Sequence, residues 1–582
     1  MEEEGWDETL DEVSVELDEE SDSLRPVDVP VFGLPEGATL HLPNHPSLTR
    51  ILRDVKRQEH SPRNCVASIV YDARMFVARL PAVFPGWSIF GNKRCGAWYV
   101  PPDGSDDVLP KQCYFKSTDG HVNKWGFSFA RLNLHVALDA ARHGGCIVVD
   151  ATRRGKMFPD ALSKTVPIWC AVVNTAVALY RMDTVDVDDE SSEGNFAQIS
   201  LQLPPWVPDG EAAQIEARID AWAMQLVDAG IEEFATLARE MSKPLVCIWA
   251  HPSHDRLPEV DDAMRERSTV VVLASASVYG SRERRAMRLD NGEEVVFSYV
   301  AGAADDEETW GQGLTPELMW AWFEQILMEE DGNGKFVKGL VAREGSRGHK
   351  GTSECGLGEE TGQSVFTRIV DGEDNAFVGI ASHAYVLKHG DGVIDGTTAV
   401  FNVSSCDLGN YVGCEPCTLI ASSTLTAGAM QSKECRVAEI DGSHITRYCW
   451  VKNAASRKHP VVEYAPCSVT FASHHLQAGH SVLFVYDADT SSISVALLLA
   501  SMIALFTLED NKFRRISEGY TINAGSGSVI PAIEAGTRVS PGSPGSFSRE
   551  VFRRYVANVT VRLPHVVMRK AILKQVFNVF VR

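Results

Sequence analysis

Short apolar runs that end in polar, glycine-containing turns recur along the chain, and the clearest of them lies at 144–150. There Cys-Ile-Val-Val is followed by Asp150, and the polar turn Thr152-Arg153-Arg154-Gly155-Lys156 comes next. Pro159 follows the turn, and proline favours the first position of a helix. The pattern predicts a buried strand, a loop and a helix, with Asp150 at the carboxyl end of the strand.

This predicted loop has the features of an anion site. Backbone N–H groups at a helix N-terminus attract phosphate, and Arg153, Arg154 and Lys156 add full positive charges. Ligands of α/β sheets collect where strands end. A solvated surface turn is the alternative interpretation of the same charges. We favour the phosphate site because the loop follows a strand that is apolar throughout.

The same alternation continues over the rest of the chain. Strands are predicted at 243–249, 268–273, 399–403 and 480–486, and helices at 166–179, from Asp209, and from the Thr315-Pro316 cap. The strand at 480–486 also runs into a polar loop and a helix. Alternating strands and helices indicate the α/β class.

Composition divides the chain into four segments. Residues 1–24 hold twelve Asp and Glu and no Lys or Arg, which is typical of a disordered tail. We expect an N-terminal catalytic domain at 25–342, a Gly-, Ser- and charge-rich linker at 343–372, and a second domain at 373–582. The last stretch, 548–582, carries eight Lys or Arg and one acid. Such a stretch either packs on the domain or binds a phosphate backbone.

Net charge and apolar content indicate which classes of partner, nucleic acid or membrane, the protein can have. The net charge of −23 falls to −11 without the acidic tail, so it does not exclude a nucleic-acid partner. We find no apolar run of membrane-spanning length and an acidic rather than leader-like N-terminus. The thirteen cysteines follow no disulfide framework and are expected to be free thiols. We therefore expect a cytoplasmic protein with no membrane or DNA partner.

Four segments closely resemble the initiator-tRNA 2′-O-ribosylphosphate transferases of fungi and plants. They are 114–121 (Tyr-Phe-Lys-Ser-Thr-Asp-Gly-His), 131–135 (Arg-Leu-Asn-Leu-His), 149–156 and 159–170. The acidic segment 302–310 and Gly-Leu-Thr-Pro at 313–316 fit the same family. The resemblance is dense over the first domain and loose over the second.

The resemblance implies a specific reaction. The family transfers 5-phosphoribosyl from phosphoribosyl pyrophosphate to the 2′-hydroxyl of the purine at position 64, in the T-stem of initiator tRNA. Pyrophosphate leaves, and the modified initiator is kept out of elongation. The resemblance also implies that the C-terminal domain is similar to a dual-specificity phosphatase domain.

Candidate residues follow from this chemistry. The acceptor hydroxyl needs a general base, and Asp119, His121 and Asp150 remain open for that role. Mg²⁺ held by Asp305 and Asp306 would neutralise the pyrophosphate, although the pair could instead be an acidic helix start. For the tRNA backbone we select Arg553, Arg554, Arg569 and Lys570. The donor phosphates are assigned to Lys116, Ser117, Thr118, Arg131, Thr152, Arg153, Arg154, Gly155, Lys156 and Lys164.

Spacing suggests a further relation. Cysteine-dependent phosphatases place a cysteine after a strand and an arginine six positions later; here Asp150 and Lys156 hold those positions, and Asp487 and Ile493 hold them in the second domain. The N-terminal domain is thus either a second phosphatase-like domain or an unrelated α/β fold. A phosphatase activity fails because neither loop supplies the thiolate. A non-catalytic tRNA-binding protein derived from a phosphatase is the remaining alternative.

Overall fold

The computed structural model describes parts of the chain that form two α/β sheets with their helices. The chain divides into the units Met1–Val55 and Lys56–Arg582, and all described residues belong to the second. The expected acidic tail at 1–24 lies outside them. The described residues are 60–102, 112–152, 156–184, 201–278, 283–329, 334–347, 366–371, 376–393, 398–405, 408, 417–419, 448–451, 454–509, 512–515, 521–522, 529–530 and 547–581.

The first sheet has five strands in the order β2-β1-β3-β5-β4, and every pair is parallel. Its strands are β1 (Ser88–Asn92), β2 (Gln112–Cys113), β3 (Gly145–Asp150), β4 (Leu245–Ala250) and β5 (Thr269–Ser275). β3 and β5 are buried along their whole length, which explains their continuous apolar sequences. The apolar run that ends at Asp150 is therefore the central strand β3, as predicted.

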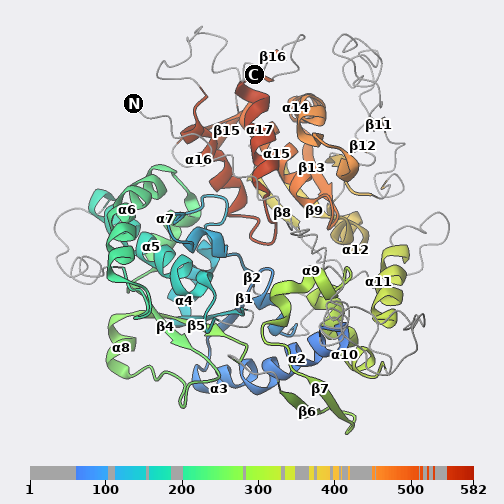
Figure 1. Cartoon of the computed structure of the whole chain (residues 1–582). Coiled ribbons are helices and arrows are strands. Elements are labelled where there is room, and N and C mark those ends of the chain that lie inside the picture. The colour runs from blue at the N-terminus through green and yellow to red at the C-terminus, as the bar shows by residue number, and fades with distance from the viewer. Residues whose placement is uncertain are drawn as a thin grey trace, which may run out of the picture. The chain divides into compact units, whose positions relative to one another are not determined.

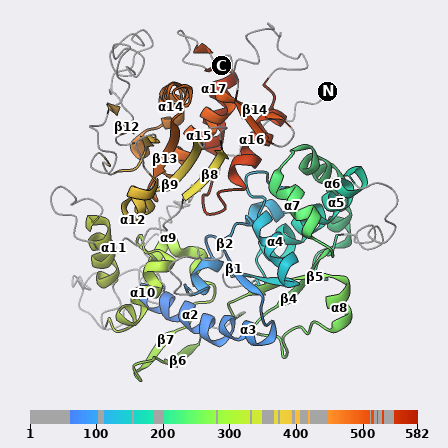
Figure 2. The same ribbon diagram turned by 180° about the vertical axis from the view of Figure 1, so that it is seen from behind.

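Helices cover both faces of this sheet (Figures 1 and 2). One face packs on α4 (Leu134–His143), α5 (Val166–Thr184), α6 (Asp209–Asp228) and α7 (Glu232–Glu240). The other packs on α2 (Pro62–Met75), the 3₁₀ turns η1 (Val77–Arg79) and η2 (Gly96–Tyr99), α3 (Leu80–Val83), α10 (Pro316–Leu327) and α11 (Lys335–Arg347). Two separate apolar cores result, one on each side of the sheet.

Helix α5 lies in the interior. With the π-helical turn η4 (Ala161–Thr165) before it, it forms a stretch, Ala161–Asp183, that is long and apolar enough to cross a membrane. This corrects the expectation that no apolar run reaches that length. However, 83% of its apolar window is buried inside the protein, as in a core helix.

Smaller elements complete the N-terminal part. They are α8 (Asp262–Arg267), the hairpin β6 (Arg284–Arg288) and β7 (Glu294–Ser298), the 3₁₀ turns η3 (Ser117–Gly120) and η6 (Ala303–Asp306), and α9 (Glu307–Trp310). The predicted cap of α10 is confirmed, because the Thr315 hydroxyl accepts a hydrogen bond from the Leu318 N–H with Pro316 at the first position. The predicted cap of α6 is shifted by one residue: Pro208 is the N-cap, and Asp209 is the first helical residue.

The second sheet has six strands in the order β11-β12-β10-β13-β9-β8. All neighbours are parallel except β8, which pairs antiparallel with β9. The strands are β8 (Phe366–Asp371), β9 (Phe377–Ser382), β10 (Thr398–Asn402), β11 (Cys417–Leu419), β12 (Tyr448–Val451) and β13 (Ser481–Tyr486). β8 lies inside the expected linker at 343–372, and α11 extends past 342 to Arg347. Both ends of the expected linker therefore contain regular structure, while the domain boundaries themselves stay a prediction.

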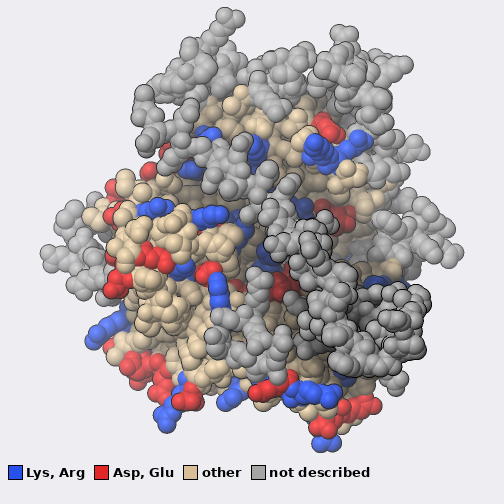
Figure 3. Space-filling view, in the orientation of Figure 1, with Lys and Arg blue, Asp and Glu red and all other residues tan. Residues whose placement is uncertain are grey.

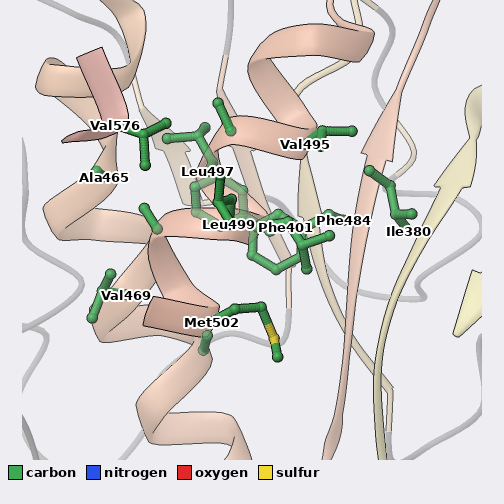
Figure 4. Close-up of a cluster of buried hydrophobic side chains, with 14 of the residues drawn as sticks. Ile380, Phe401, Ala465, Val469, Phe484, Val495, Leu497, Leu499, Met502 and Val576 are labelled. Atoms are coloured by element: carbon green, nitrogen blue, oxygen red, sulfur yellow. The ribbon is translucent and has the colours of Figure 1, made fainter. Parts of the chain in front are cut away.

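The core of this second sheet is built on α14 (Pro460–Gln477) and α15 (Ser491–Leu505). Figure 4 shows Val495, Leu497, Leu499 and Met502 of α15 grouped with Phe401 and Phe484 of the sheet. The remaining elements are α12 (His383–Val393), the 3₁₀ turn η7 (Ala454–Ser456), α16 (Arg549–Thr560), α17 (Lys570–Val581) and the short pairs β14 (Phe506–Glu509) with β15 (Lys512–Arg515) and β16 (Thr521–Ile522) with β17 (Val529–Ile530).

The cysteines follow the expectation in part. Seven in the described part of the chain are buried and are not in disulfides: Cys65, Cys95, Cys113, Cys146, Cys170, Cys247 and Cys449. Cys467, in α14, is disulfide-bonded, so the expectation of free thiols fails there.

Candidate active site

The parallel sheet brings the predicted polar turns to one edge. Its five strands end at Asn92, Cys113, Asp150, Ala250 and Ser275, and Asp150 belongs to the central strand. In register, Asp150 lies beside Ser275 of β5. This carboxyl edge is where open α/β sheets bind their ligands.

Asp150 is enclosed at this edge and accepts three hydrogen bonds. Its side chain is 2% exposed. The Asn92 Nδ2 donates to its Oδ2 at 2.8 Å, and the Ala151 N–H donates to its Oδ1 at 2.9 Å. The Gly96 N–H also donates to this carboxylate. These contacts tie the segment that follows β1 to the end of β3.

Gly96 packs so closely that no side chain fits there. A Cβ at this position would lie 1.9 Å from the Val149 carbonyl oxygen and 3.0 Å from the Asp150 Cα. Glycine allows two backbone segments to approach at this distance. Gly96 therefore sets the position of the N–H that donates to Asp150.

The pKa of Asp150 is raised to about 7. Burial is the largest cause, and the nearby charge of Asp305 adds to it; the hydrogen bonds from Asn92, Ala151 and Gly96 oppose it. A carboxylate with a pKa near neutrality changes its protonation state in the pH range where a general base works. Perturbed carboxylates of this kind cluster at functional sites.

Asn92 was missed by the sequence analysis, and it connects three strand ends. Its Oδ1 accepts from the Phe115 N–H at 2.7 Å, and its Nδ2 donates to the Phe115 carbonyl at 3.0 Å as well as to Asp150. It is 3% exposed. Asn92 thus joins β1, the chain beyond β2 and β3.

The polar turn after β2 lies against the start of the helix that follows the central loop. A Cβ on Gly120 would meet the Asp160 carbonyl oxygen and the Thr165 Oγ1, each at 2.9 Å. The Thr165 hydroxyl donates to the Lys116 carbonyl at 3.1 Å. The two segments that carry the family resemblance, 114–121 and 159–170, are therefore in direct contact.

Asp119 is held by an ion pair. The Arg131 guanidinium donates to its carboxylate at 2.6 Å, and the same guanidinium lies over the Tyr114 ring at 5.3 Å. Both charged side chains are about one-fifth exposed. Two predicted site residues, one catalytic and one donor-binding, are thus brought together, although their roles remain predictions.

His121 and Lys156 meet at a shared carboxylate. Asp160 Oδ2 lies 2.9 Å from the Lys156 Nζ and 3.5 Å from the His121 Nε2. Lys156 and His121 are 59% and 44% exposed, so both groups face solvent. Asp160 was not selected from the sequence; its spacing of four residues from Lys156 was the available signal.

The other predicted donor-binding residues differ in their surroundings. Lys116, Ser117 and Thr118 are partly exposed, and Thr152 is buried beside Asp150. Arg153, Arg154 and Gly155 lie outside the described residues. Lys164 is buried and pairs with Glu211 at 2.9 Å, and the Trp125 indole donates to the same Glu211 oxygen at 2.8 Å. The charge of Lys164 is therefore already compensated by the carboxylate of Glu211, whose side chain is 11% exposed.

The acidic turn 302–306 reaches the same edge. Gly302 has φ of 61°, and its N–H donates to the Ser277 Oγ at 3.0 Å. The charge of Asp305 raises the pKa of Asp150 and that of the Cys95 thiol, whereas the charge of Asp306 acts on Cys65. Asp306 is the N-cap of α9, but its side chain makes no cap hydrogen bond. The alternative of an acidic helix start remains open, because Asp305 and Asp306 lie in the first turn of η6 and directly before α9.

A buried network supports this turn. The Tyr299 hydroxyl donates to the Asp72 carboxylate at 2.8 Å and accepts from the Val278 N–H at 2.9 Å. Tyr99 and Ser277 share a hydrogen bond of 3.2 Å. Burial raises the pKa of Asp72 to about 8, opposed by its hydrogen bonds and by Arg285.

Within the described ranges, no three His, Cys, Asp or Glu residues lie close enough to form a ready-made metal site. Mg²⁺ bound with a phosphorylated substrate needs only one or two carboxylates from the protein. Asp305 and Asp306 fit that smaller requirement by residue type. Their role as metal ligands stays a prediction.

The loop after β13 has a different character. Asp487 accepts four hydrogen bonds, from the N–H and hydroxyl of Ser405 at 2.7 and 2.6 Å and from the N–H and hydroxyl of Thr490 at 3.0 and 2.8 Å. They lower its pKa against the opposing effect of burial. Ile493 and Ser494 are buried. Asp487 thus joins the Ser405 loop to Thr490, the residue directly before α15. The phosphatase-like nature of the C-terminal domain stays a prediction.

The C-terminal basic stretch has an exposed part and a packed part. Arg553, Arg569 and Lys570 are exposed and Arg554 is partly buried, while Arg562 pairs with Glu233 of α7 at 2.5 Å. Packing and nucleic-acid binding remain compatible for this stretch. Figure 3 shows basic and acidic side chains intermingled over the described part of the face in view.

An aromatic cluster at the β4 side of the edge was also missed. Phe158 stacks on Trp206, and His251, at the end of β4, lies 5.5 Å from the Phe158 ring. Trp249 lies edge-on to Trp206 at 6.1 Å. These residues come from segments far apart in the sequence, so no local pattern indicated them.

Comparison with known proteins connects this region to a family. Residues 55–342 match the family model described as the Rit1 N-terminal domain. The chain is 39% identical over 279 residues to an uncharacterized protein of Schizosaccharomyces pombe, covering 47% of this chain and 55% of that protein. It is 35% identical over 295 residues to a tRNA A64-2′-O-ribosylphosphate transferase of Saccharomyces cerevisiae, covering 48% and 54%.

The chain thus spans about half the length of the curated relatives it matches. No solved structure matches it significantly. The matched region contains the first sheet with its carboxyl edge, the acidic turn and the residues around Asp150. Through residues 55–342, the chain belongs to the Rit1 family.

Proposed function

We propose that the protein is a pentosyltransferase that moves 5-phosphoribosyl from phosphoribosyl pyrophosphate to the 2′-hydroxyl of the purine at position 64 of cytoplasmic initiator tRNA. The observation that carries the proposal is that the family match covers the described site, and that a relative matched there is named a tRNA A64-2′-O-ribosylphosphate transferase. In support, Asp150 at the carboxyl edge has a pKa of about 7, and the sequence directly after it contains Arg153, Arg154 and Lys156.

Asp150 is the proposed general base. Its two oxygens accept three hydrogen bonds, from Asn92, Ala151 and Gly96, so one lone pair of the carboxylate is left for an acceptor hydroxyl. Asp119 is committed to Arg131, and His121 faces Asp160, so these two are better suited to binding substrate. Lys156 and the loop before it would take phosphate oxygens through charge-assisted hydrogen bonds.

Charge develops on the pyrophosphate as the bond to ribose breaks. Asp305 and Asp306 are the residues proposed to hold Mg²⁺, which when bound would neutralise this charge. Asp305 is the stronger candidate of the two for a metal ligand at the carboxyl edge, because its charge acts on Asp150. Substituting each with Asn should lower activity at ordinary Mg²⁺, with part of it restored at high Mg²⁺.

The test is pyrophosphate release from phosphoribosyl pyrophosphate with and without initiator tRNA, together with transfer of the labelled ribose to the tRNA. A transferase releases pyrophosphate only when tRNA is present and labels the tRNA in equal amount. Phosphate release without tRNA would indicate a phosphatase. Binding of tRNA with neither product would indicate a non-catalytic tRNA-binding protein.

Variants at the three candidate bases refine the test. Asp150→Asn should lose transfer by about 10²-fold or more, and the wild-type kcat/KM should fall below a pH of about 7 as Asp150 becomes protonated. Asp119→Asn and His121→Ala should retain that pH profile with weaker substrate binding. A wild-type profile in a folded Asp150→Asn variant would remove Asp150 from the role.

A further inference from the structure

Trp206 presents a flat aromatic face to solvent beside the candidate site. Its side chain is 49% exposed, which is unusual for so large an apolar group. Phe158 stacks on it with ring centroids 5.0 Å apart and planes only 14° from parallel. Because Phe158 is 5% exposed, one face of the indole is covered and the exposed area belongs to the rest of the ring.

The indole is fixed in place. Its Nε1 donates to the Ser163 hydroxyl at 3.3 Å, and the Trp249 ring packs edge-on at 6.1 Å. Trp249 is itself anchored by a hydrogen bond from its Nε1 to the Leu162 carbonyl at 3.0 Å. A ring held this way loses little conformational entropy when another ring stacks on it.

The platform is attached to the same edge as Asp150. Phe158 follows the central loop, and the neighbouring Met157 carbonyl accepts a hydrogen bond from Ser275 at 2.7 Å. Ser275 lies beside Asp150 in the sheet register. We call Phe158 and Trp206 together the Trp206 platform. Met157 and Ser275 connect this platform to Asp150 at the end of β3.

Cations lie near the platform, together with the acids Asp160 and Asp255. Lys156 is 59% exposed on the loop that leads to Phe158. His254 and Arg256 are exposed on the loop after β4, and the His254 ring lies 6.2 Å from that of Phe158. A flat aromatic face combined with nearby cations is how proteins bind unstacked bases of single-stranded nucleic acid.

We propose that the Trp206 platform stacks on a nucleobase of the RNA acceptor that is unpaired or displaced from its helix. The proposal rests on the proposed function for the identity of the RNA. A base inside a duplex has both faces covered by its neighbours, so only an unpaired or displaced base can lie on the indole. The donor, phosphoribosyl pyrophosphate, has no nucleobase, so the platform acts on the acceptor alone.

The experiment measures the affinity of the full chain for an initiator tRNA transcript, at several salt concentrations, and the KM for both substrates. Trp206→Ala should raise the Kd and the KM for tRNA by about 5- to 150-fold, the range for loss of one base–aromatic stack. The KM for phosphoribosyl pyrophosphate should not change. The salt slope of tRNA binding should also stay constant, because the indole contacts no phosphate.

Matched variants separate stacking from packing. Trp206→Phe keeps an aromatic face and should bind tRNA within about threefold of wild type. Trp206→Met keeps apolar volume without the face and should bind as weakly as Trp206→Ala. Met224→Ala removes another exposed apolar side chain, 57% exposed on α6, and should leave the Kd unchanged. Melting temperatures confirm that each variant is folded.

Three results would overturn the proposal: an unchanged Kd in a folded Trp206→Ala variant, wild-type binding by Trp206→Met, or a salt slope lowered by about one unit. Failure of the proposed function has a different signature. If the wild type binds tRNA and Trp206→Ala weakens that binding, the platform stands even when no ribosylphosphate is transferred.

Discussion

Replacing Asp150 with Asn should change how the stability of the protein depends on pH. The folded-state pKa of about 7 lies above the ordinary value of 3.8, because the carboxyl group is buried beside Asp305. The stability contributed by Asp150 is therefore fully present below a pH of about 4. It is lost as the pH rises from about 4 to about 7, because the unfolded state then releases the proton that the folded state still holds.

The magnitude follows from the shift. A difference of about 3 pKa units corresponds to about 4 kcal/mol once the group is ionised in both states. Most of this loss, about 3 kcal/mol, falls between pH 5 and pH 8. Asp150→Asn cannot ionise, so its free energy of unfolding should lack this component. The variant should thus gain stability relative to the wild type as the pH rises.

The assay is urea unfolding of both proteins at pH 5, 6, 7 and 8. The difference in the free energy of unfolding between variant and wild type removes the other titrating groups, which the two proteins share. Asp72→Asn serves as a comparison, because Asp72 is equally buried with a pKa of about 8, and its difference curve should bend at the higher pH. Parallel curves for Asp150→Asn and wild type across this range would refute the assignment of a raised pKa.

Three further predictions concern packing, hydrogen bonding and charge. Gly96→Ala should destabilise the fold by about 3 kcal/mol or more and disrupt the site, because its Cβ would overlap the Val149 carbonyl. Gly210→Ala, which has open space around it, should be neutral, and thermal unfolding measures both variants. Asp487→Ala removes four hydrogen bonds and should lower the free energy of unfolding by about 2 kcal/mol, but it should transfer ribosylphosphate at the wild-type rate with saturating substrates. A large loss of kcat would show that the active site is not in the first sheet. Arg553→Ala combined with Arg569→Ala should weaken tRNA binding and reduce its salt slope by about two units, and an unchanged slope would leave both as surface residues only.

Local signals predicted much of this structure. The apolar run ending at Asp150 is the central strand, and the Thr315-Pro316 cap begins α10 as expected. Both predictions succeed because periodicity and capping act over a few residues. The contact between 114–121 and 159–170 could be anticipated only through the family resemblance, since it joins distant segments.

The missed residues act over long range. Asn92 bonds to a carboxylate 58 positions away, and Tyr299 to one 227 positions away. An asparagine at a strand end is a common surface feature. The neighbouring sequence therefore does not distinguish a buried asparagine that links two strands from one that faces solvent. Strand β8 was placed in a linker for the same reason: its partner β9, not its own composition, makes it part of the sheet. The stacking of Phe158 on Trp206 likewise depends on tertiary contacts alone.

The position of Asn92 makes one backbone amide a reporter for the whole edge. The Phe115 N–H is held by the Asn92 side chain, and the same side chain holds Asp150, while β2 itself contributes only two residues to the sheet. A short edge strand opens more readily than a central one, so this amide should exchange its hydrogen with solvent faster than the amides of β3. Any ligand that engages Asp150 also restrains Asn92, and through it the Phe115 amide. Slower deuterium uptake there on adding the donor would register occupancy of the site without any measurement of turnover.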